Sequence, residues 1–195
     1  MTEARRLSGR PCPDPRTGRA VIKLGPGDHA VIDAPDTLLL TVLGSCVAAC
    51  IRDPVAAVGG MNHFMLPKSP DGRWGIASSS LRYGNFAMEQ LINDILRHGG
   101  RRERLEVKVF GGARIGPDTS EIGTRNAKYV EDYLKAEGLM ALVSDLRGNR
   151  ARRLAYLPVS GRAFMTELPD PSHDIIASER KFHPPPPYGT VELFQ

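Results

Sequence analysis

The sequence has few cysteines and few aromatic residues, and it has no long apolar run. Three of its 195 residues are cysteine and 6% are aromatic. An odd number of cysteines cannot all pair within the chain, so we expect free thiols. No uninterrupted apolar stretch reaches the roughly 18 residues that can span a bilayer, and none follows the basic N-terminus as in a secretory signal. These absences indicate a cytoplasmic protein without a membrane-inserted segment.

The charge balance is only mildly positive. The chain has 26 lysines and arginines against 22 aspartates and glutamates, a net charge of +4. Nucleic-acid binding would need a basic stripe with stacking aromatic residues, so we expect no nucleic-acid partner. A mild positive charge is better suited to steering the protein toward an acidic protein partner. The sequence also has no Walker lysine and no GxGxxG loop, so it gives no support for nucleotide binding.

The pattern along the chain predicts one compact domain between two tails. Residues 1–19 are rich in Arg, Pro and Gly and predict a flexible basic arm. Residues 168–195 form a Pro-rich C-terminal tail, in which four consecutive prolines favour polyproline II over a packed element. This tail is either disordered or docks on a partner. Residues 20–167 are long enough to bury one hydrophobic core.

Within the domain, the apolar periodicity predicts many strands and two helices. The helices are expected from Asn85, as N-cap, to His98 and from about Arg125 to Glu137. The strands are expected at 28–33, 38–43, 46–51, 58–65, 105–110, 139–145, 153–159 and 162–168. Because several strands are consecutive, we expect an α/β (α+β) fold of mixed or antiparallel sheets covered by helices, rather than a regular βα alternation.

A predicted hairpin brings together a cysteine and a histidine. An Asp-Pro pair favours a type I turn, which makes residues 53–56 the hairpin loop. Arg52 then opposes Ala57, and Cys46 opposes His63 on the same face, with Cβ atoms about 4.5–5.5 Å apart. A slip of one residue would put the two side chains on opposite faces.

A thiol beside an imidazole can act as a nucleophile toward a carbonyl carbon. The imidazole takes the thiol proton and can later protonate a leaving amine. Gly44 would leave room for a substrate backbone, and the amides near Ser45 and Cys46 are candidate oxyanion donors. The hydroxyl of Thr41 or of Ser45 could orient His63.

A structural role for Cys46 is the alternative, because cysteine is among the most buried residue types. Cys50 lies on the same strand face about 13 Å away, since a strand advances about 3.3 Å per residue. That separation is too long for a disulfide or a shared tetrahedral metal site. We therefore expect no metal and no cofactor.

Several motifs occur in a fixed order between about residue 25 and residue 167. They are the segments Leu43–Val47, Asp53-Pro54, Gly59–Pro67, Arg82–Gly84 with Ala87-Met88, Lys108–Ala113, and Ile122-Gly123 followed by Arg125-Asn126. Together these motifs resemble the CheD family, the chemoreceptor glutamine deamidases of bacterial chemotaxis.

The resemblance implies an activity and a site. CheD-like proteins hydrolyse the side-chain amide of selected glutamines on methyl-accepting chemotaxis receptors. Cys46 matches the family's nucleophile and His63 its general base. The family's third residue is a threonine shortly before the cysteine. Its position falls on Leu40 when counted without gaps, so Thr41, one residue later, is the candidate.

The resemblance also implies a layered sandwich similar to the catalytic domain of cytotoxic necrotizing factor toxins, and some relatives bind a CheC-type phosphatase. One departure is the segment Asp145–Gly148, where the family usually has a Gly-Gly turn. Two other functions remain open: a binding module that docks a receptor or a phosphatase, and a cysteine hydrolase of different specificity.

Overall fold

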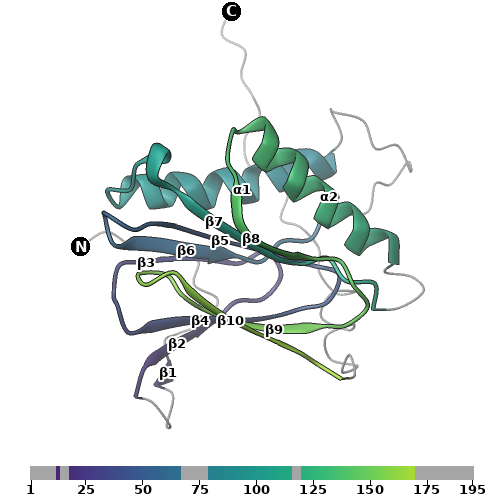
Figure 1. The fold of residues 1–195 in the computed structure, drawn as a ribbon, viewed down its shortest axis with the longest axis horizontal. Coiled ribbons are helices and arrows are strands. Elements are labelled where there is room, and N and C mark those ends of the chain that lie inside the picture. Colours follow the sequence, from purple (N-terminus) through teal and green to yellow (C-terminus); the bar gives the residue numbers. More distant parts are fainter. Residues whose placement is uncertain (1–11, 14–17, 67–78, 116–119, 170–195) are drawn as a thin grey trace, which may run out of the picture.

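Two stacked β-sheets form the body of the protein in this computed structural model, which describes residues 12–13, 18–66, 79–115 and 120–169. Within the described residues, each sheet has five strands, and two α-helices lie against the outer face of one sheet (Figure 1). The predicted fold class, mixed sheets covered by helices, is confirmed. The likeness to the cytotoxic necrotizing factor toxins stays an expectation.

The first sheet carries no helix contacts of note and runs in the order β1-β2-β4-β9-β10. Its β2 and β4 are parallel, and its other neighbours are antiparallel. Its strands are β1 (Cys12–Pro13), β2 (Ala20–Lys23), β4 (Thr37–Leu43), β9 (Arg152–Leu157) and β10 (Arg162–Glu167).

The second sheet runs in the order β3-β6-β5-β7-β8 and is antiparallel except between β7 and β8. Its strands are β3 (His29–Ile32), β5 (Val47–Asp53), β6 (Val58–Asn62), β7 (Glu106–Gly111) and β8 (Ala141–Leu146). The helices α1 (Ser79–Arg97) and α2 (Ser120–Ala136) cover it, and a 3-10 turn, η1 (Arg102–Arg104), precedes β7.

Strand β5 is buried on both faces, which explains its uninterrupted apolar sequence. Val47, Ala49 and Ile51 pack toward the helices, in a cluster with residues of α1 and α2. Cys46, just before the strand, and Cys50 pack instead between the two sheets. The alternation of a strand therefore separates two cores, and the cysteines belong to the inner one.

Both helices begin earlier than the sequence predicts, because a glycine that looks like a boundary lies inside each helix. A Cβ on Gly84 would come within 2.6 Å of the Tyr129 ring, and one on Gly123 within 2.3 Å of the Ala113 carbonyl oxygen. These glycines allow close packing and do not end the helices. Asn85 is therefore not an N-cap, and its Oδ1 accepts a hydrogen bond from the Tyr129 hydroxyl at 2.8 Å.

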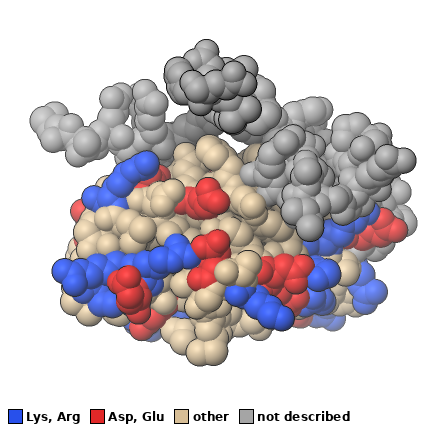
Figure 2. Space-filling view, turned by 90° about the horizontal axis from the view of Figure 1, so that it is seen from above, with Lys and Arg blue, Asp and Glu red and all other residues tan. Residues whose placement is uncertain are grey.

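The eight predicted strands correspond to β3–β10, but β2 was not predicted, and neither was β1, which lies within the predicted arm and pairs with β2. Most of the predicted basic arm and residues 170–195 of the predicted tail lie outside the described residues. None of the described helices is long and apolar enough to cross a membrane. On the face seen in Figure 2, basic and acidic side chains are interspersed. On α2, Lys128 and Asp132 form an ion pair one turn apart.

The predicted register of the β5–β6 hairpin is wrong by one residue on each strand. Asp53 pairs with Val58, and Arg52 pairs with Gly59 rather than with Ala57. The loop is therefore residues 54–57, and Ala57 takes a left-handed φ of 53° at its end. Because the combined shift is two residues, the side chains keep their faces, although Cys46 and His63 are no longer directly opposite.

Asp53 explains why the loop begins one residue later than predicted. Its Oδ1 accepts hydrogen bonds from the amides of Val55 (2.8 Å) and Ala56 (3.1 Å), and its Oδ2 accepts one from the amide of Arg101 (2.8 Å). The Arg104 guanidinium also donates to it. Burial alone would raise the pKa of this carboxyl, but the Arg104 side chain and the three amides lower it below its ordinary value.

Replacing Asp53 with Asn should lower the free energy of unfolding by about 2–3 kcal/mol at pH 7, because the buried network loses its negative charge and one of its two acceptor oxygens, and the new amide hydrogens face other donors. A carboxyl with a lowered pKa contributes stability above its ordinary pKa near 4 and loses it as the pH falls further. The difference in free energy of unfolding between wild type and Asp53→Asn should therefore become smaller below about pH 4. Chemical denaturation across pH checks this, with Asp132→Asn, an exposed ion-pair variant expected to change stability by under about 0.5 kcal/mol, as control.

Candidate active site

The loop between β4 and β5 carries Cys46, and its carbonyl groups accept hydrogen bonds from the segment after β7 and from α2. The Gly44 oxygen accepts a hydrogen bond from the Ala113 amide at 2.9 Å, and the Cys46 oxygen accepts one from the Gly112 amide at 2.7 Å. The Ser45 oxygen accepts one from Asn126 Nδ2 at 2.8 Å. Three consecutive carbonyls are therefore fixed by the end of β7 and by α2.

Gly111 is required by the close approach of this loop to β7. Its φ is +111°, and a Cβ there would lie 2.2 Å from the Cys46 carbonyl oxygen. Any side chain would therefore push the Cys46 loop away. Gly111 and Gly112, at the end of β7, therefore support the loop that carries the candidate nucleophile.

Asn126 joins the Cys46 loop to the segment that follows His63. It is fully buried on α2, and while its Nδ2 donates to Ser45, its Oδ1 accepts from the amide of Leu66 at 2.9 Å. Sequence reasoning assigned no role to Asn126. Its position in the sequence could have indicated a role, because it lies four residues before Val130 on the apolar face of a helix. An amide side chain buried there without a hydrogen bond would destabilise the fold.

His63 follows the end of β6 and is fixed by its backbone. Its amide donates to the Asp28 carbonyl at 2.9 Å, and its carbonyl accepts from the Gly27 amide at 2.7 Å. The adjacent Asn62 is buried too, and its side chain bonds the Ala49 amide and the Ala87 carbonyl. Asn62 thus connects β5, β6 and α1 at the place where the histidine begins.

The His63 ring reaches across to the first sheet. Its Nδ1 lies 2.8 Å from Thr41 Oγ1 and 3.4 Å from the Leu24 carbonyl oxygen. The Thr41 hydroxyl donates its hydrogen to the same carbonyl at 2.8 Å. Since that hydroxyl has one hydrogen and a carbonyl can only accept, this network assigns the proton of a neutral His63 to Nδ1. Nε2 is then the basic nitrogen.

Cys46 and His63 both face the space between the sheets. The pairing of Cys50 with Met61 and the isolated bridge between Val47 and Phe64 define one register for the hairpin. In that register Cys46 and His63 are diagonal neighbours on one face, a separation that side chains of this length can bridge. The inner cluster around Cys46 and the Thr41 bond of His63 both place them on the inner face.

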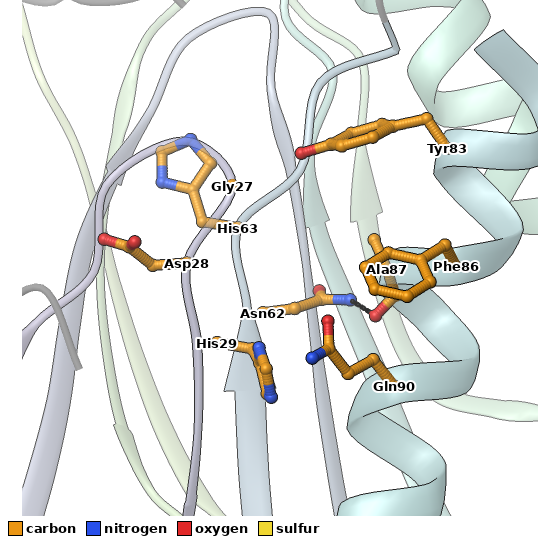
Figure 3. Close-up of a pocket in the computed structure, with 9 residues that line it drawn as sticks. All are labelled: Gly27, Asp28, His29, Asn62, His63, Tyr83, Phe86, Ala87 and Gln90. Carbon is orange, nitrogen blue, oxygen red and sulfur yellow. Dashed lines mark hydrogen bonds between the residues drawn. The ribbon is translucent and has the colours of Figure 1, made fainter. Parts of the chain in front are cut away.

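A pocket opens beside His63, between the second sheet and α1 (Figure 3). It is lined by Gly27, Asp28, His29, Asn62, His63, Tyr83, Phe86, Ala87 and Gln90. The Tyr83 hydroxyl points across the pocket toward the side of His63. His29 has a structural partner, because its Nε2 lies 2.9 Å from Asp94 Oδ2 on α1.

The other predicted site residues lie in or behind the Cys46 loop. Gly44 and Ser45 are buried, and the Ser45 hydroxyl donates to the Met65 sulfur at 3.9 Å, whereas Thr41 is the hydroxyl that contacts His63. Neither Cys46 nor Cys50 forms a disulfide. Among the described residues, no three His, Cys, Asp or Glu side chains group as metal ligands.

The whole chain is similar to known proteins. Residues 65–167 match the family model described as CheD chemotactic sensory transduction. The chain is 51% identical to the probable chemoreceptor glutamine deamidase CheD of Rhodopseudomonas palustris (strain BisA53), over 93% of this chain and 87% of that protein. The chain belongs to the CheD family. A second CheD protein, from Acidiphilium cryptum (strain JF-5) and also named a probable chemoreceptor glutamine deamidase, is 48% identical over 89% of this chain and 93% of that protein.

Among solved structures, the Neisseria meningitidis protein NMB0706, of the DUF152 family model, is similar with a TM-score of 0.45 and 11% identity. The alignment covers 73% of this chain and 76% of that one.

The turn after β8 is where the sequence departs from the Gly-Gly expected of a CheD protein. Arg147 takes a left-handed φ of 72°, which costs about 1–2 kcal/mol for a residue with a side chain. Its guanidinium forms a bidentate ion pair with Glu131 on α2, at 2.6 and 2.7 Å, and its amide donates to the Gly111 carbonyl. The ion pair offsets part of the backbone strain, and the turn still supports the Gly111 segment.

Iodoacetamide should label Cys46 well before Cys50. Both cysteines are fully buried, and burial raises the pKa of the Cys50 thiol, with Lys108 offsetting only part of the effect, whereas Cys46 is a diagonal neighbour of His63 on the inner face. In a Cys12→Ser background, mass spectrometry of digests over time would follow both sites. His63→Ala should slow the labelling of Cys46 and leave that of Cys50 unchanged. Faster labelling of Cys50 would contradict the assignment of the nucleophile.

Proposed function

We propose that this protein hydrolyses the side-chain amide of glutamines on methyl-accepting chemotaxis receptors, in the cytoplasm, through a thioester on Cys46. Family membership supports the reaction, since the relatives named above are called probable chemoreceptor glutamine deamidases. The observation that carries the mechanism is the 2.8 Å contact between Thr41 Oγ1 and His63 Nδ1, on the inner face that Cys46 shares.

In the first half of the reaction, His63 Nε2 takes the proton of the Cys46 thiol. The sulfur bonds to the carbonyl carbon of the glutamine side chain, and the carbonyl electron pair moves to oxygen. Backbone amides of the Gly44–Cys46 loop are the proposed donors to this oxyanion. When the double bond re-forms, the C–N bond breaks, the nitrogen takes the proton held by His63, and ammonia leaves.

In the second half, the same histidine activates water. His63 Nε2 takes a proton from a water molecule as its oxygen bonds to the thioester carbon. The C–S bond then breaks, the sulfur recovers the proton, and the receptor side chain leaves as glutamate. Thr41 acts on both halves, because it holds Nδ1 as the protonated nitrogen and so keeps Nε2 as the base.

Two other functions predict different results in the experiment described below. A docking module would bind a receptor, or a CheC-type phosphatase, without turnover. A cysteine hydrolase of different specificity would cleave peptides or incorporate amines. Gly112, Ala113 and Asn126 hold the Cys46 loop in one arrangement, which favours an enzyme over a docking module, and family membership favours the deamidase over another hydrolase.

The deciding experiment is mass spectrometry of a receptor signalling domain co-expressed with this protein. Deamidation adds about 1 Da at each modified glutamine and releases ammonia. Peptide cleavage or amine incorporation would instead support a different hydrolase, and receptor binding without a mass change would support the docking module.

Cys46→Ala should abolish deamidation, and His63→Ala should lower it almost as far, because each removes a group that the acyl transfer needs. Cys46→Ser should also be nearly inactive, since a hydroxyl is much harder to ionise. Receptor binding should persist in all three. Cys50→Ala is the matched control and should retain turnover, and substantial turnover by Cys46→Ala would refute the covalent mechanism.

Thr41→Val should lower kcat/KM for deamidation about 10- to 100-fold, because the isosteric side chain no longer accepts the Nδ1 hydrogen of His63. Thr41→Ser restores a hydroxyl and should recover most of the activity. Thr37→Val, a change on the same strand and the same face, is the control. Equal activity of Thr41→Val and wild type would remove Thr41 from the mechanism.

A further inference from the structure

The pocket beside His63 holds a second hydroxyl that the mechanism above does not use. Tyr83, on the first turns of α1, lines this pocket opposite the loop of Gly27 and Asp28. In Figure 3 its hydroxyl points into the pocket, toward the side on which His63 lies. A proton acceptor and a hydrogen-bond donor therefore border one pocket from two different elements.

The position of Tyr83 is fixed by the packing of the next two residues. Gly84 has no Cβ and lets α1 approach the Tyr129 ring of α2, where a Cβ would lie 2.6 Å from a ring carbon. Asn85 accepts a hydrogen bond from the Tyr129 hydroxyl at 2.8 Å. One turn further along α1, the Ala87 carbonyl accepts a hydrogen bond from Asn62, the residue before His63. These contacts tie the backbone around Tyr83 to the strand that carries His63.

The electrostatic surroundings keep the Tyr83 phenol protonated. Burial raises its pKa above the ordinary value, and the negative charges of Cys46 and Asp28 raise it further. The phenol therefore acts at neutral pH as a donor and not as a base. The place of the hydroxyl comes from the geometry: Tyr83 and His63 line the same pocket, and the hydroxyl points toward the side on which His63 lies.

We infer that Tyr83 is a further catalytic residue, whose hydroxyl donates a hydrogen bond to the side-chain carbonyl oxygen of the target glutamine. The inference rests on the deamidation proposed above. The glutamine nitrogen takes its proton from His63, so the substrate amide lies beside this pocket, and a donor that lines the pocket is within reach of its carbonyl oxygen. As the C–S bond forms and the carbonyl electron pair moves to oxygen, Tyr83 keeps its proton and shares it with the oxyanion. The proton that leaves with ammonia still comes from His63.

The test compares Tyr83→Phe with Tyr129→Phe, which removes the same atom from a neighbouring tyrosine whose hydroxyl bonds Asn85 instead. Tyr83→Phe should lower kcat for receptor deamidation about 100-fold and change KM by less than about 3-fold, as loss of one oxyanion donor does. Tyr129→Phe should lower thermal stability and keep kcat within about 3-fold of wild type. Equal loss of kcat in both variants would reduce Tyr83 to a structural role and overturn the inference.

A second measurement separates the oxyanion from the thiol. A receptor peptide with an aldehyde in place of the glutamine carboxamide should form a hemithioacetal with Cys46, whose oxygen occupies the place of the oxyanion. Tyr83→Phe should lower the affinity for this inhibitor by about the same factor by which it lowers kcat. Iodoacetamide should still alkylate Cys46 at the wild-type rate. Unchanged inhibition, or an equal loss of alkylation, would overturn the inference. An inactive wild-type protein would overturn the proposed deamidation and this inference with it, whereas unchanged turnover by Tyr83→Phe would overturn the inference alone.

Discussion

The contact between Thr41 and His63 joins the two sheets at the site, and the site depends on how those sheets stack. Thr41 belongs to a strand of the first sheet, and His63 follows a strand of the second. The protonated nitrogen of the imidazole is therefore selected by the spacing between the sheets. That spacing is set by the inner core, where large side chains such as Leu39, Leu43 and Tyr156 pack beside Cys46. In this fold, core packing and the choice of the basic nitrogen of His63 are physically coupled.

The buried amide side chains of Asn62 and Asn126 position the two reacting segments from the opposite side. Each side chain accepts one hydrogen bond through its oxygen and donates one through its nitrogen. Asn62 joins β5 to α1, and Asn126, on α2, joins the Cys46 loop to the segment after His63. A buried amide with only one end satisfied would be destabilising, so these residues favour a single arrangement of the loop and the histidine. The helices thereby hold the backbone of the site, while the first sheet orients the imidazole.

Residue patterns predicted mixed sheets covered by helices and placed Cys46 and His63 on one face of a hairpin, because the alternation along β5 and an Asp-Pro turn are local signals, but the predicted direct pairing of the two residues was wrong. The register differed by one residue per strand because Asp53 binds Arg101 and Arg104, which are about fifty residues away in the chain. The helix starts were misjudged for the same reason: Gly84 and Gly123 serve contacts with other elements. The parallel strand β2 has no local pattern that distinguishes it from the arm before it. Thr41 came from the family resemblance together with its position near Cys46, and only the folded chain brings it to the His63 ring.

The candidate reactive groups and the residues that hold the Cys46 loop are far apart in the sequence. Thr41, Cys46 and His63 all lie in the first third of the sequence, but the loop around the cysteine is shaped by residues 111–113 and by Asn126. A ribosome-bound chain that ends before these residues carries the thiol, the imidazole and the hydroxyl without the hydrogen bonds that arrange the loop. A nascent chain can therefore contain these three groups and still lack the arranged loop, so the geometry of the candidate site is completed only after nearly two thirds of synthesis.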